Sequence, residues 1–282
     1  MALIEKGLYG GQLHNTDEVE NYTGFESIKG FELAEKMEEH AQSLDNVDHI
    51  YADVQVVKKD DDIFRIHLGT DVIESKTVVG ATGVKHRKLN VVGEEDYEGR
   101  GVSYCAVCDG AFFKGKHVAV VGGGDSAVES ALYLSNIVDK VTLIHRRDEL
   151  RAEEILQKRL FEKDNIDFIW NANIEEIFGN DTEGVKAVSY IDKRDVYKVK
   201  SIDIDGVFVN VGVIPVTHMF KHMGLMTVNS EGFLVAGSDM STMIKGLYAV
   251  GDVRRDSVRQ VVSATGDGAI ASESLSSYLN NI

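Results

Sequence analysis

The stretch His117-Val-Ala-Val-Val-Gly-Gly-Gly-Asp-Ser-Ala127 decides the fold class of this 282-residue chain. Its apolar run predicts a buried strand, its three glycines a turn, and the small residues after them a helix over Asp125–Asn136. A second apolar strand is expected at Val141–Ile144. Strand, glycine turn, helix and strand in this order open a βαβ unit that binds dinucleotides.

The three glycines and the residues after them match the pattern G-x-G-x-x-A, whose residue types have physical reasons. The first glycine permits the tight turn, the second lets the backbone approach a pyrophosphate, and the small last residue lets helix and strand pack closely. The N-terminus of the helix adds free N–H groups for the phosphates. A tight turn in any α/β protein can look similar, but the flanking strand and helix favour a dinucleotide site. The predicted contacts are Gly122, Gly124, Asp125, Ser126 and Ala127.

A basic cluster follows the second strand, where an NAD site usually has an acidic residue for the ribose hydroxyls. Here the chain has His145-Arg146-Arg147, with Arg151 one helical turn further. Guanidinium groups can fork onto a 2′-phosphate, which favours NADPH over NADH. The alternative is a solvated basic patch, unusual at this place in an acidic protein.

An internal repeat sets the domain organisation, since Leu3–Gly83 and His117–Gly212 share one plan. The first segment opens at what would be the second strand of a dinucleotide unit, Ala2–Ile4. A helix is expected over Phe31–Leu44, where leucine, methionine and alanine make one apolar face. The first segment lacks a strand, glycine turn and helix at its start. Later strands are expected near 63–68, 77–79 and 207–211.

After Gly212 the chain crosses once more and ends in a helix expected over Val258–Leu279, which returns to the first domain. The predicted fold is therefore α/β, with two Rossmann-like, three-layer dinucleotide-binding domains, one inserted into the other. Residues 86–211 form the NADPH-binding domain. Residues 1–85 and 212–282 form a discontinuous FAD-binding domain without its first βα unit.

Composition excludes some functions. The net charge is −16, from 46 acidic and 30 basic residues, and such an excess repels nucleic acids. No apolar run approaches the roughly 20 residues of a membrane helix. The acidic residue at Glu5 argues against a signal peptide, so a cytoplasmic location is expected.

The two cysteines of the chain, Cys105 and Cys108, form one Cys-x-x-Cys. Zinc needs about four ligands, and no second pair stands at suitable spacing, so no metal is expected. Two buried structural thiols would not explain the paired spacing. A redox dithiol explains it best, with Asp109 as its acid or base. Alternatively, Asp109 is a plain turn residue before Gly110.

Weaker signals suggest a flavin. Gly10-Gly11-Gln12 is a glycine turn, Thr82-Gly83 closes a strand, and Gly251-Asp252 places an acid after an apolar strand, where it can accept hydrogen bonds from ribitol hydroxyls. Glu5 could bind an adenosine ribose. Plain surface turns and an ordinary exposed glutamate are the alternatives.

Taken together, these motifs resemble the low-molecular-weight bacterial thioredoxin reductases along essentially the whole chain. The stretch from Gly99 to Gly110, around the cysteines, is similar nearly residue for residue. The other matching stretches are Gly10–Leu13, Glu18–Asn21, Gly24-Phe25, Gly122–Ala127, His145–Ala152, Gly251–Val253 and Arg259-Gln260.

The resemblance implies a role for each matching residue. Cys108 would face the flavin, Cys105 would exchange with thioredoxin, and Asp109 would handle protons. Hydride would pass from NADPH to FAD, and electrons onward through the Cys105–Cys108 disulfide to thioredoxin. A homodimer is implied, as is rotation of the inserted domain on the crossings at 84–89 and 212–216. FAD would be lined by Glu5, Gly11, Gln12, Asn21, Thr82, Gly83, Gly251, Asp252, Arg259 and Gln260.

Two departures from the family pattern stand out. The family begins with a strand, a G-x-G-x-x-G turn and a helix that bind the FAD pyrophosphate, whereas this chain begins one strand later. Three prolines that usually precede glycines are here Tyr9, Thr23 and Lys245. The alternative to a working reductase is a truncated or degenerate NADPH-binding protein without flavin or catalysis. A flavoprotein partner of a peroxiredoxin would carry an extra N-terminal domain, and related ferredoxin reductases lack the cysteine pair.

Overall fold

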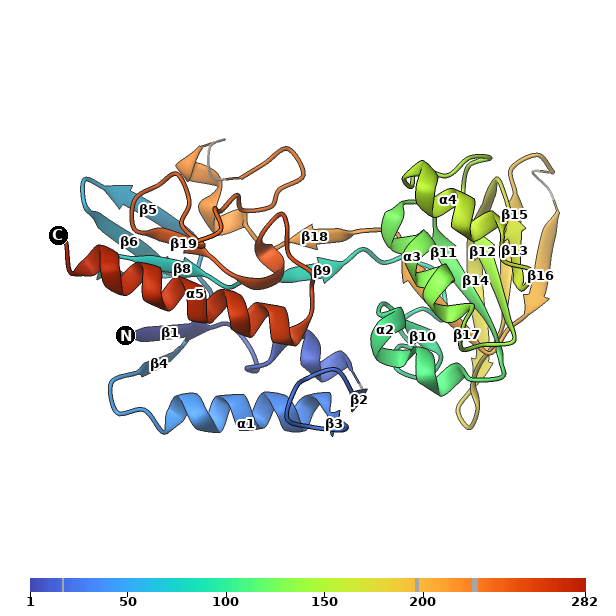
Figure 1. The fold of residues 1–282 in the computed structure, drawn as a ribbon, viewed down its shortest axis with the longest axis horizontal. Helices are drawn as coiled ribbons and strands as arrows, with labels where there is room; N and C mark the ends of the chain where they lie inside the picture. Colours follow the sequence, from blue (N-terminus) through green and yellow to red (C-terminus); the bar gives the residue numbers. More distant parts are fainter. Residues whose placement is uncertain (17, 196–197, 225–227) are drawn as a thin grey trace. The chain divides into compact units, whose positions relative to one another are not determined.

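The computed structural model describes residues 1–16, 18–195, 198–224 and 228–282 (Figure 1). The chain divides into two compact units. Unit 1 consists of Met1–His14, Glu20–Lys85 and Ile214–Ile282, and unit 2 of Asn15–Val19 and His86–Val213. Each unit has its own hydrophobic core.

Unit 2 is built on a parallel five-stranded sheet. The glycine-rich stretch from His117 to Ala127 supplies its central strand, β11 (His117–Gly122), and the next predicted strand is its neighbour β12 (Lys140–Ile144). The order is β10 (Val102–Ser103), β17 (Gly206–Asn210), β11, β12 and β13 (Ile166–Ile169). Carboxyl ends of parallel strands share one edge, and the glycine turn lies at that edge.

The two faces of this sheet carry different layers, because successive side chains of a strand point to opposite faces. Val118 and Val120 pack with the helix α3 (Asp125–Leu134) and with Leu160 of α4 (Glu154–Phe161). Ala119 and Val121 lie in a second core with an antiparallel sheet. That sheet consists of β14 (Ala172–Asn180), β15 (Gly184–Asp192) and β16 (Val199–Asp203). Unit 2 is thus a three-layer α/β unit.

In unit 1, four short strands form two separate parallel pairs. β1 (Ala2–Glu5) pairs with β4 (Asp48–Tyr51), and β8 (Val78–Gly80) pairs with β19 (Leu247–Ala249). By the internal repeat, β1 corresponds to β12 and β8 to β17, the two neighbours of β11. No strand of the described residues joins the two pairs. An antiparallel sheet of β5 (Val56–Asp60), β6 (Ile63–Leu68) and β7 (Asp71–Ser75) completes the unit.

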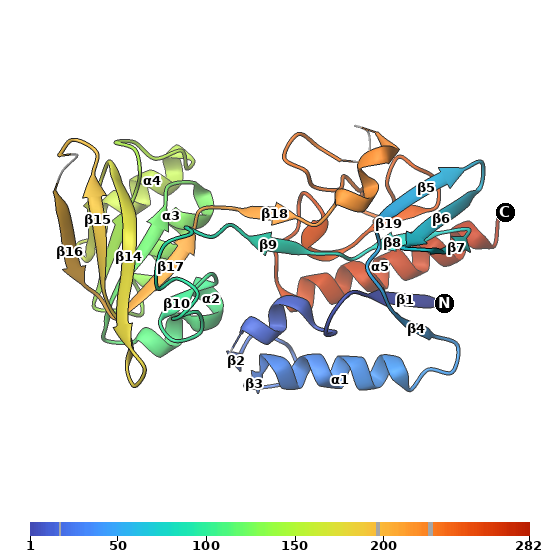
Figure 2. The same ribbon diagram turned by 180° about the vertical axis from the view of Figure 1, so that it is seen from behind.

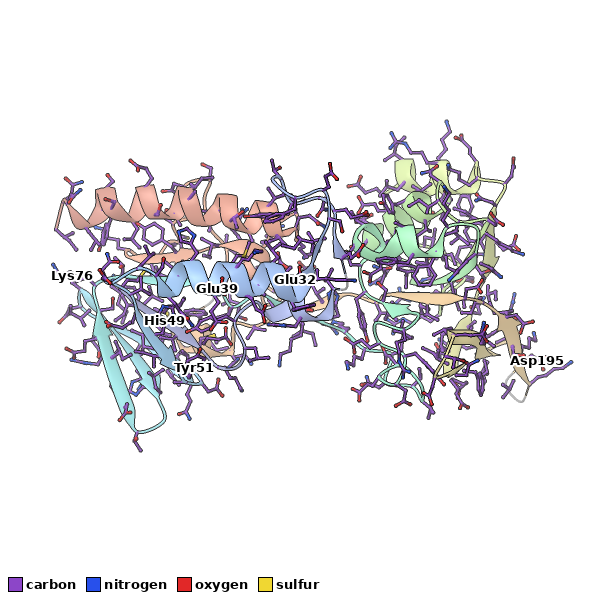
Figure 3. The ribbon with its side chains drawn as sticks, turned by 90° about the horizontal axis from the view of Figure 1, so that it is seen from below. Glu32, Glu39, His49, Tyr51, Lys76 and Asp195 are labelled. Atoms are coloured by element: carbon purple, nitrogen blue, oxygen red, sulfur yellow. A yellow bond between two sulfur atoms is a disulfide. The ribbon has the colours of Figure 1, made fainter. Side chains whose placement is uncertain are left out.

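Both helices of unit 1 lie close to their predicted positions. α1 (Gly30–Gln42) buries Leu33 and Ala34, and the β4 residues His49 and Tyr51 lie alongside it (Figure 3). α5 (Val261–Leu279) begins three residues later than predicted. The reason is local, since Arg259 has a left-handed backbone (φ 59°) and Gln260 forms a capping box with Ser263.

The two long segments of unit 1 are joined to His86–Val213 of unit 2 through β9 (Val84–His86) and β18 (Val213–Pro215), which pair side by side (Figures 1 and 2). A backbone hydrogen bond closes each end of this pair, from Arg87 N to Gly212 O and from Val216 N to Gly83 O, both 3.0 Å. None of the described helices is long and apolar enough to span a membrane. The remaining short elements are η1 (Gly11–Asn15), β2 (Glu18–Val19), β3 (Ile28–Lys29), α2 (Ala106–Asp109), η2 (Gly110–Phe113), η3 (His218–Met223) and η4 (Gly251–Val253).

Candidate active site

The two cysteines form a disulfide at the start of α2, with sulfurs 2.10 Å and Cα atoms 5.3 Å apart. Cys105 is the N-cap residue of this short helix, and the backbone N–H of Cys108 donates to its Sγ at 3.2 Å. An N–H pointing at a sulfur favours the thiolate form once the disulfide is reduced. Both cysteines are half-buried, so part of the disulfide remains accessible to a reaction partner.

Asp109 lies at the end of α2, held by a residue that the sequence did not single out. Ser103, only 6% exposed at the end of β10, donates its hydroxyl to Asp109 Oδ2 at 2.5 Å. The same Oγ accepts the backbone N–H of Cys105 at 3.1 Å. Serine is too common beside turns for this role to be visible in the sequence.

A buried carboxylate braces the segment that leads to the cysteines. Glu94 is 1% exposed and accepts the backbone N–H groups of Leu89 (2.9 Å) and Asn90 (2.7 Å) and the hydroxyl of Tyr104 (3.0 Å). Burial, together with this carboxylate, raises the pKa of Tyr104 above its usual value, so the phenol stays a donor. His86, on the crossing strand β9, stacks on Tyr104 with ring centroids 5.0 Å apart. Sequence reasoning missed Glu94, because nothing marks one glutamate among so many as buried.

The predicted phosphate turn has the shape that its glycines suggested. A Cβ on Gly122 would collide with the carbonyl of Asn210 and lie 2.7 Å from the Cβ of Ala127, so strand and helix pack at backbone distance there. A Cβ on Gly124 would meet nothing within 4 Å, which leaves space before the first turn of α3. Ser126 is exposed on that turn, while Asp125 accepts the N–H of Glu153 at 2.8 Å.

The basic cluster separates into exposed arginines and a buried histidine. Arg146, Arg147 and Arg151 are exposed, and the backbone N–H of Arg151 donates to Gly123 O at 2.7 Å, which holds this arginine beside the turn. His145 is 4% exposed and its ring lies against Gly123. Burial lowers the pKa of His145, and the neighbouring guanidinium groups lower it further. The neutral ring therefore supports the turn from behind.

In unit 1, several residues predicted to line a flavin are held by hydrogen bonds between distant segments. Asn21 Nδ2 donates to Gln260 Oε1 at 2.9 Å, and Gln12 Nε2 to Val84 O at 3.0 Å. Thr82 Oγ1 donates to Val216 O at 2.5 Å. Gly11 and Gly83 have positive φ angles, 50° and 65°, with open space at their Cβ positions.

Asp252 follows β19 on the turn η4, as the pattern of an acid after an apolar strand predicted. Burial raises the pKa of its carboxyl group, while Arg259 and a hydroxyl of Ser257 at 3.4 Å act against that rise. The turn itself is clamped by Asp267 of α5, which accepts the N–H of Gly251 at 3.0 Å. Glu5, at the end of β1, accepts the N–H of Gly7 at 2.8 Å.

Each unit has features that suit a different dinucleotide cofactor, and unit 2 has the more complete set. Unit 2 offers a glycine turn with open space before a helix and exposed arginines beside it, which suits a phosphorylated nicotinamide dinucleotide. Unit 1 offers glycines with open space and a half-buried acid, which suits the ribitol and ring part of a flavin. The described part of unit 1 has no counterpart of the β11–α3 turn. Among the described residues, no three His, Cys, Asp or Glu side chains gather as metal ligands.

A disulfide and a phosphate turn in one unit, beside a second α/β unit, define a disulfide oxidoreductase that uses a pyridine nucleotide. A model of the pyridine nucleotide-disulphide oxidoreductase family matches residues 1–268, and the chain belongs to that family. Within it, the chain is of the low-molecular-weight bacterial thioredoxin reductase type.

The relatives support this placement along nearly the whole chain. A thioredoxin reductase from Listeria monocytogenes is 45% identical over 99% of this chain and 86% of its own length. One from Bacillus subtilis is 43% identical over 99% and 87%. The crystal structure of thioredoxin reductase from Streptococcus pyogenes has a TM-score of 0.91 at 47% identity, covering 100% of this chain and 90% of that chain. The predicted α/β fold and the reductase interpretation are confirmed, and the alternative of a degenerate NADPH binder is not supported.

Proposed function

We propose that this chain is an NADPH-dependent thioredoxin-disulfide reductase that works through the Cys105–Cys108 disulfide. The observation that carries the proposal is the disulfide at the start of α2, with the N–H of Cys108 on Cys105 Sγ. Such an arrangement favours formation of one reactive thiolate on reduction.

Two cofactors are part of the proposal. In unit 2, Gly122, Gly124 and Ala127 with the first turn of α3 would hold the pyrophosphate of NADPH, and Arg146, Arg147 and Arg151 its 2′-phosphate. In unit 1, Asp252 and the hydrogen-bonded pair of Asn21 and Gln260 would hold FAD. The other flavin contacts would be Glu5, Gly11, Gln12, Thr82, Gly83, Gly251 and Arg259. When bound, the two cofactors supply the pair of electrons that reduces the disulfide.

The reduced cysteines then carry out an exchange reaction. The Cys105 thiolate attacks the disulfide of thioredoxin, so that one mixed disulfide forms and one thioredoxin thiolate leaves. Cys108 then attacks the mixed disulfide, restores the Cys105–Cys108 bond and releases the second thioredoxin thiolate. Asp109 takes the proton of each cysteine thiol as the thiolate forms, and returns it to the thioredoxin thiolate that leaves.

Two single variants test these roles. Cys108→Ser leaves Cys105 free and should accumulate a mixed disulfide with thioredoxin, seen as a mass increase on a non-reducing gel. Cys105→Ser should accumulate none. Insulin reduction with NADPH, FAD and thioredoxin should be lost in both variants. Equal trapping by the two variants would contradict the assignment of Cys105 as the exchanging sulfur.

The proposal includes a homodimer, as the resemblance implies. Light scattering during gel filtration should give about twice the 31.1 kDa mass of one chain. A single species at the monomer mass would exclude it.

A further inference from the structure

The hydroxyl of Ser103 touches both ends of the redox loop. Its Oγ lies 2.5 Å from Asp109 Oδ2, 3.1 Å from the backbone N of Cys105 and 3.3 Å from the carbonyl O of Cys105. The hydroxyl has a single proton to donate, and the two oxygens compete for it. The contact with Asp109 is far shorter than the contact with the carbonyl, so the proton points to the carboxylate.

The position of Ser103 is fixed independently of the loop that it contacts. It is 6% exposed and pairs with Phe208 of β17, in the parallel sheet that forms the middle layer of unit 2. Asp109 lies six residues further along the chain, on the short helix α2 and outside the sheet. The buried Ser103 hydroxyl, fixed in the sheet, therefore holds the Asp109 carboxylate, which belongs to a short helix outside the sheet.

A continuous relay results, in which the N–H of Cys105 donates to Ser103 Oγ and the Ser103 hydroxyl donates to Asp109 Oδ2. Hydrogen bonds donated to a carboxylate favour its charged form. The charged form is the one that can accept a proton from a thiol. Ser103 thus links the backbone of one cysteine to the group assigned to move its proton.

We propose that Ser103 is a positioning residue, which keeps Asp109 ionised and aimed for proton exchange with the Cys105–Cys108 dithiol. The inference rests on the proposed function, because it presumes the proton role of Asp109. In the step concerned, the Asp109 carboxylate takes the proton of the attacking thiol, and the new sulfur–sulfur bond forms as the substrate disulfide breaks. The leaving thiolate receives that proton, so Asp109 returns to its carboxylate form with no net gain or loss.

A matched pair of variants tests the role without the cofactors. Ser103→Thr keeps the hydroxyl, and Ser103→Val has the same shape without it, so any crowding by the extra methyl group is common to both. The full chain is reduced with a phosphine and desalted. Its exchange with the chromogenic disulfide DTNB is then followed by absorbance between pH 5 and pH 9. Ser135→Ala is the control, since it removes another buried hydroxyl, one that donates to Leu132 O at 2.8 Å.

The expected result is a shift in the acid limb of the pH–rate profile. In Ser103→Val the limb should move to higher pH by about one unit, the size expected for loss of one charge-assisted hydrogen bond. Ser103→Thr and Ser135→Ala should match the parent chain. Circular dichroism and binding of 2′,5′-ADP verify that unit 2 is folded in each variant, and Ser103→Ala replaces Val if that variant is not.

Asp109→Asn separates failure of the inference from failure of the proposed function. If Asp109→Asn moves the acid limb to higher pH while Ser103→Val leaves it in place, Ser103 has no positioning role and the inference is wrong. If Asp109→Asn leaves the limb in place as well, the proton role of Asp109 is wrong, and the inference falls with it.

Discussion

At the scale of single residues, two adjacent glycines of the phosphate turn are glycines for different reasons. A Cβ on Gly123 would overlap the buried ring of His145, whose Nε2 is 2.5 Å from that position. Gly124 has open space around its Cβ position and a φ of −99°, which any residue can adopt. Packing against His145 therefore requires a glycine at position 123. At position 124, the close approach of a bound ligand to the turn would require one.

We expect Gly123→Ala to destabilise unit 2 by about 1–3 kcal/mol, the usual cost of overpacking. Gly124→Ala should leave stability nearly unchanged and weaken NADPH binding about tenfold or more, which is about 1.4 kcal/mol. Denaturation followed by the fluorescence of Trp170, the only tryptophan, measures the first effect, and calorimetric titration with NADPH the second. The double variant Gly123→Ala/His145→Ala should recover part of the lost stability. Equal destabilisation by the two alanines would contradict this distinction.

Two histidines of unit 2 predict a pH dependence of stability. Burial lowers the pKa of both His145 and His117 below the ordinary 6.5. The folded state therefore binds fewer protons than the unfolded state, and stability falls as the pH drops below about 6.5. Tm should decrease between pH 7.5 and pH 5.5, and the decrease should be smaller in the His117→Gln/His145→Gln variant. An identical decrease in that variant would show that other groups cause it.

At the scale of elements, one ion pair ties the turn η4 to the helix α5. Asp267 is 7% exposed and accepts from Arg254 Nε and Nη2, both at 3.1 Å, as well as from the N–H of Gly251. Asp252, the acid assigned to the flavin, lies within this turn. The clamp thus positions Asp252, the residue proposed to hold FAD, without a hydrogen bond to it.

Asp267→Ala should cost about 3 kcal/mol, because it leaves Arg254 without its partner in a largely buried place. Faster hydrogen–deuterium exchange in α5 and weaker FAD binding are the expected signs. The matched control is Asp53→Ala, which breaks the exposed pair with Lys6 and should change stability by less than 1 kcal/mol. Similar exchange rates in both variants would argue against the clamp.

Regular elements were predictable from the sequence, whereas contacts between them were not. The apolar run Val118–Val121, the glycines after it and the small residues of α3 predicted the strand, turn and helix of unit 2. The late start of α5 was missed, since no sequence rule places Arg259 in a left-handed backbone. His145 was predicted as a cofactor-binding residue, whereas its burial behind Gly123 depends on packing that a motif does not encode. Ser103 and Glu94 were missed for the same reason.

At the scale of the whole molecule, unit 2 has the properties of an independent domain. Both faces of its sheet are covered by layers drawn from His86–Val213 itself. We expect a fragment of these residues to fold and to bind NADPH within about tenfold of the affinity of the full chain. It should not bind FAD, whose proposed contacts lie in unit 1. An unfolded fragment, judged by Trp170 fluorescence and circular dichroism, would show that unit 2 needs unit 1.

The interruption of unit 1 by unit 2 has a consequence for biosynthesis. β8 finds its partner strand β19 only at Leu247–Ala249, and Tyr248 of that strand packs against Ala271 of α5. On the ribosome, the first 85 residues must therefore wait while all of unit 2 emerges and folds. Throughout that delay the nascent chain exposes an unpaired strand edge, which is where a chaperone would have to act. Synthesis of β19 and α5, rather than of the first segment, then sets the moment at which unit 1 can close.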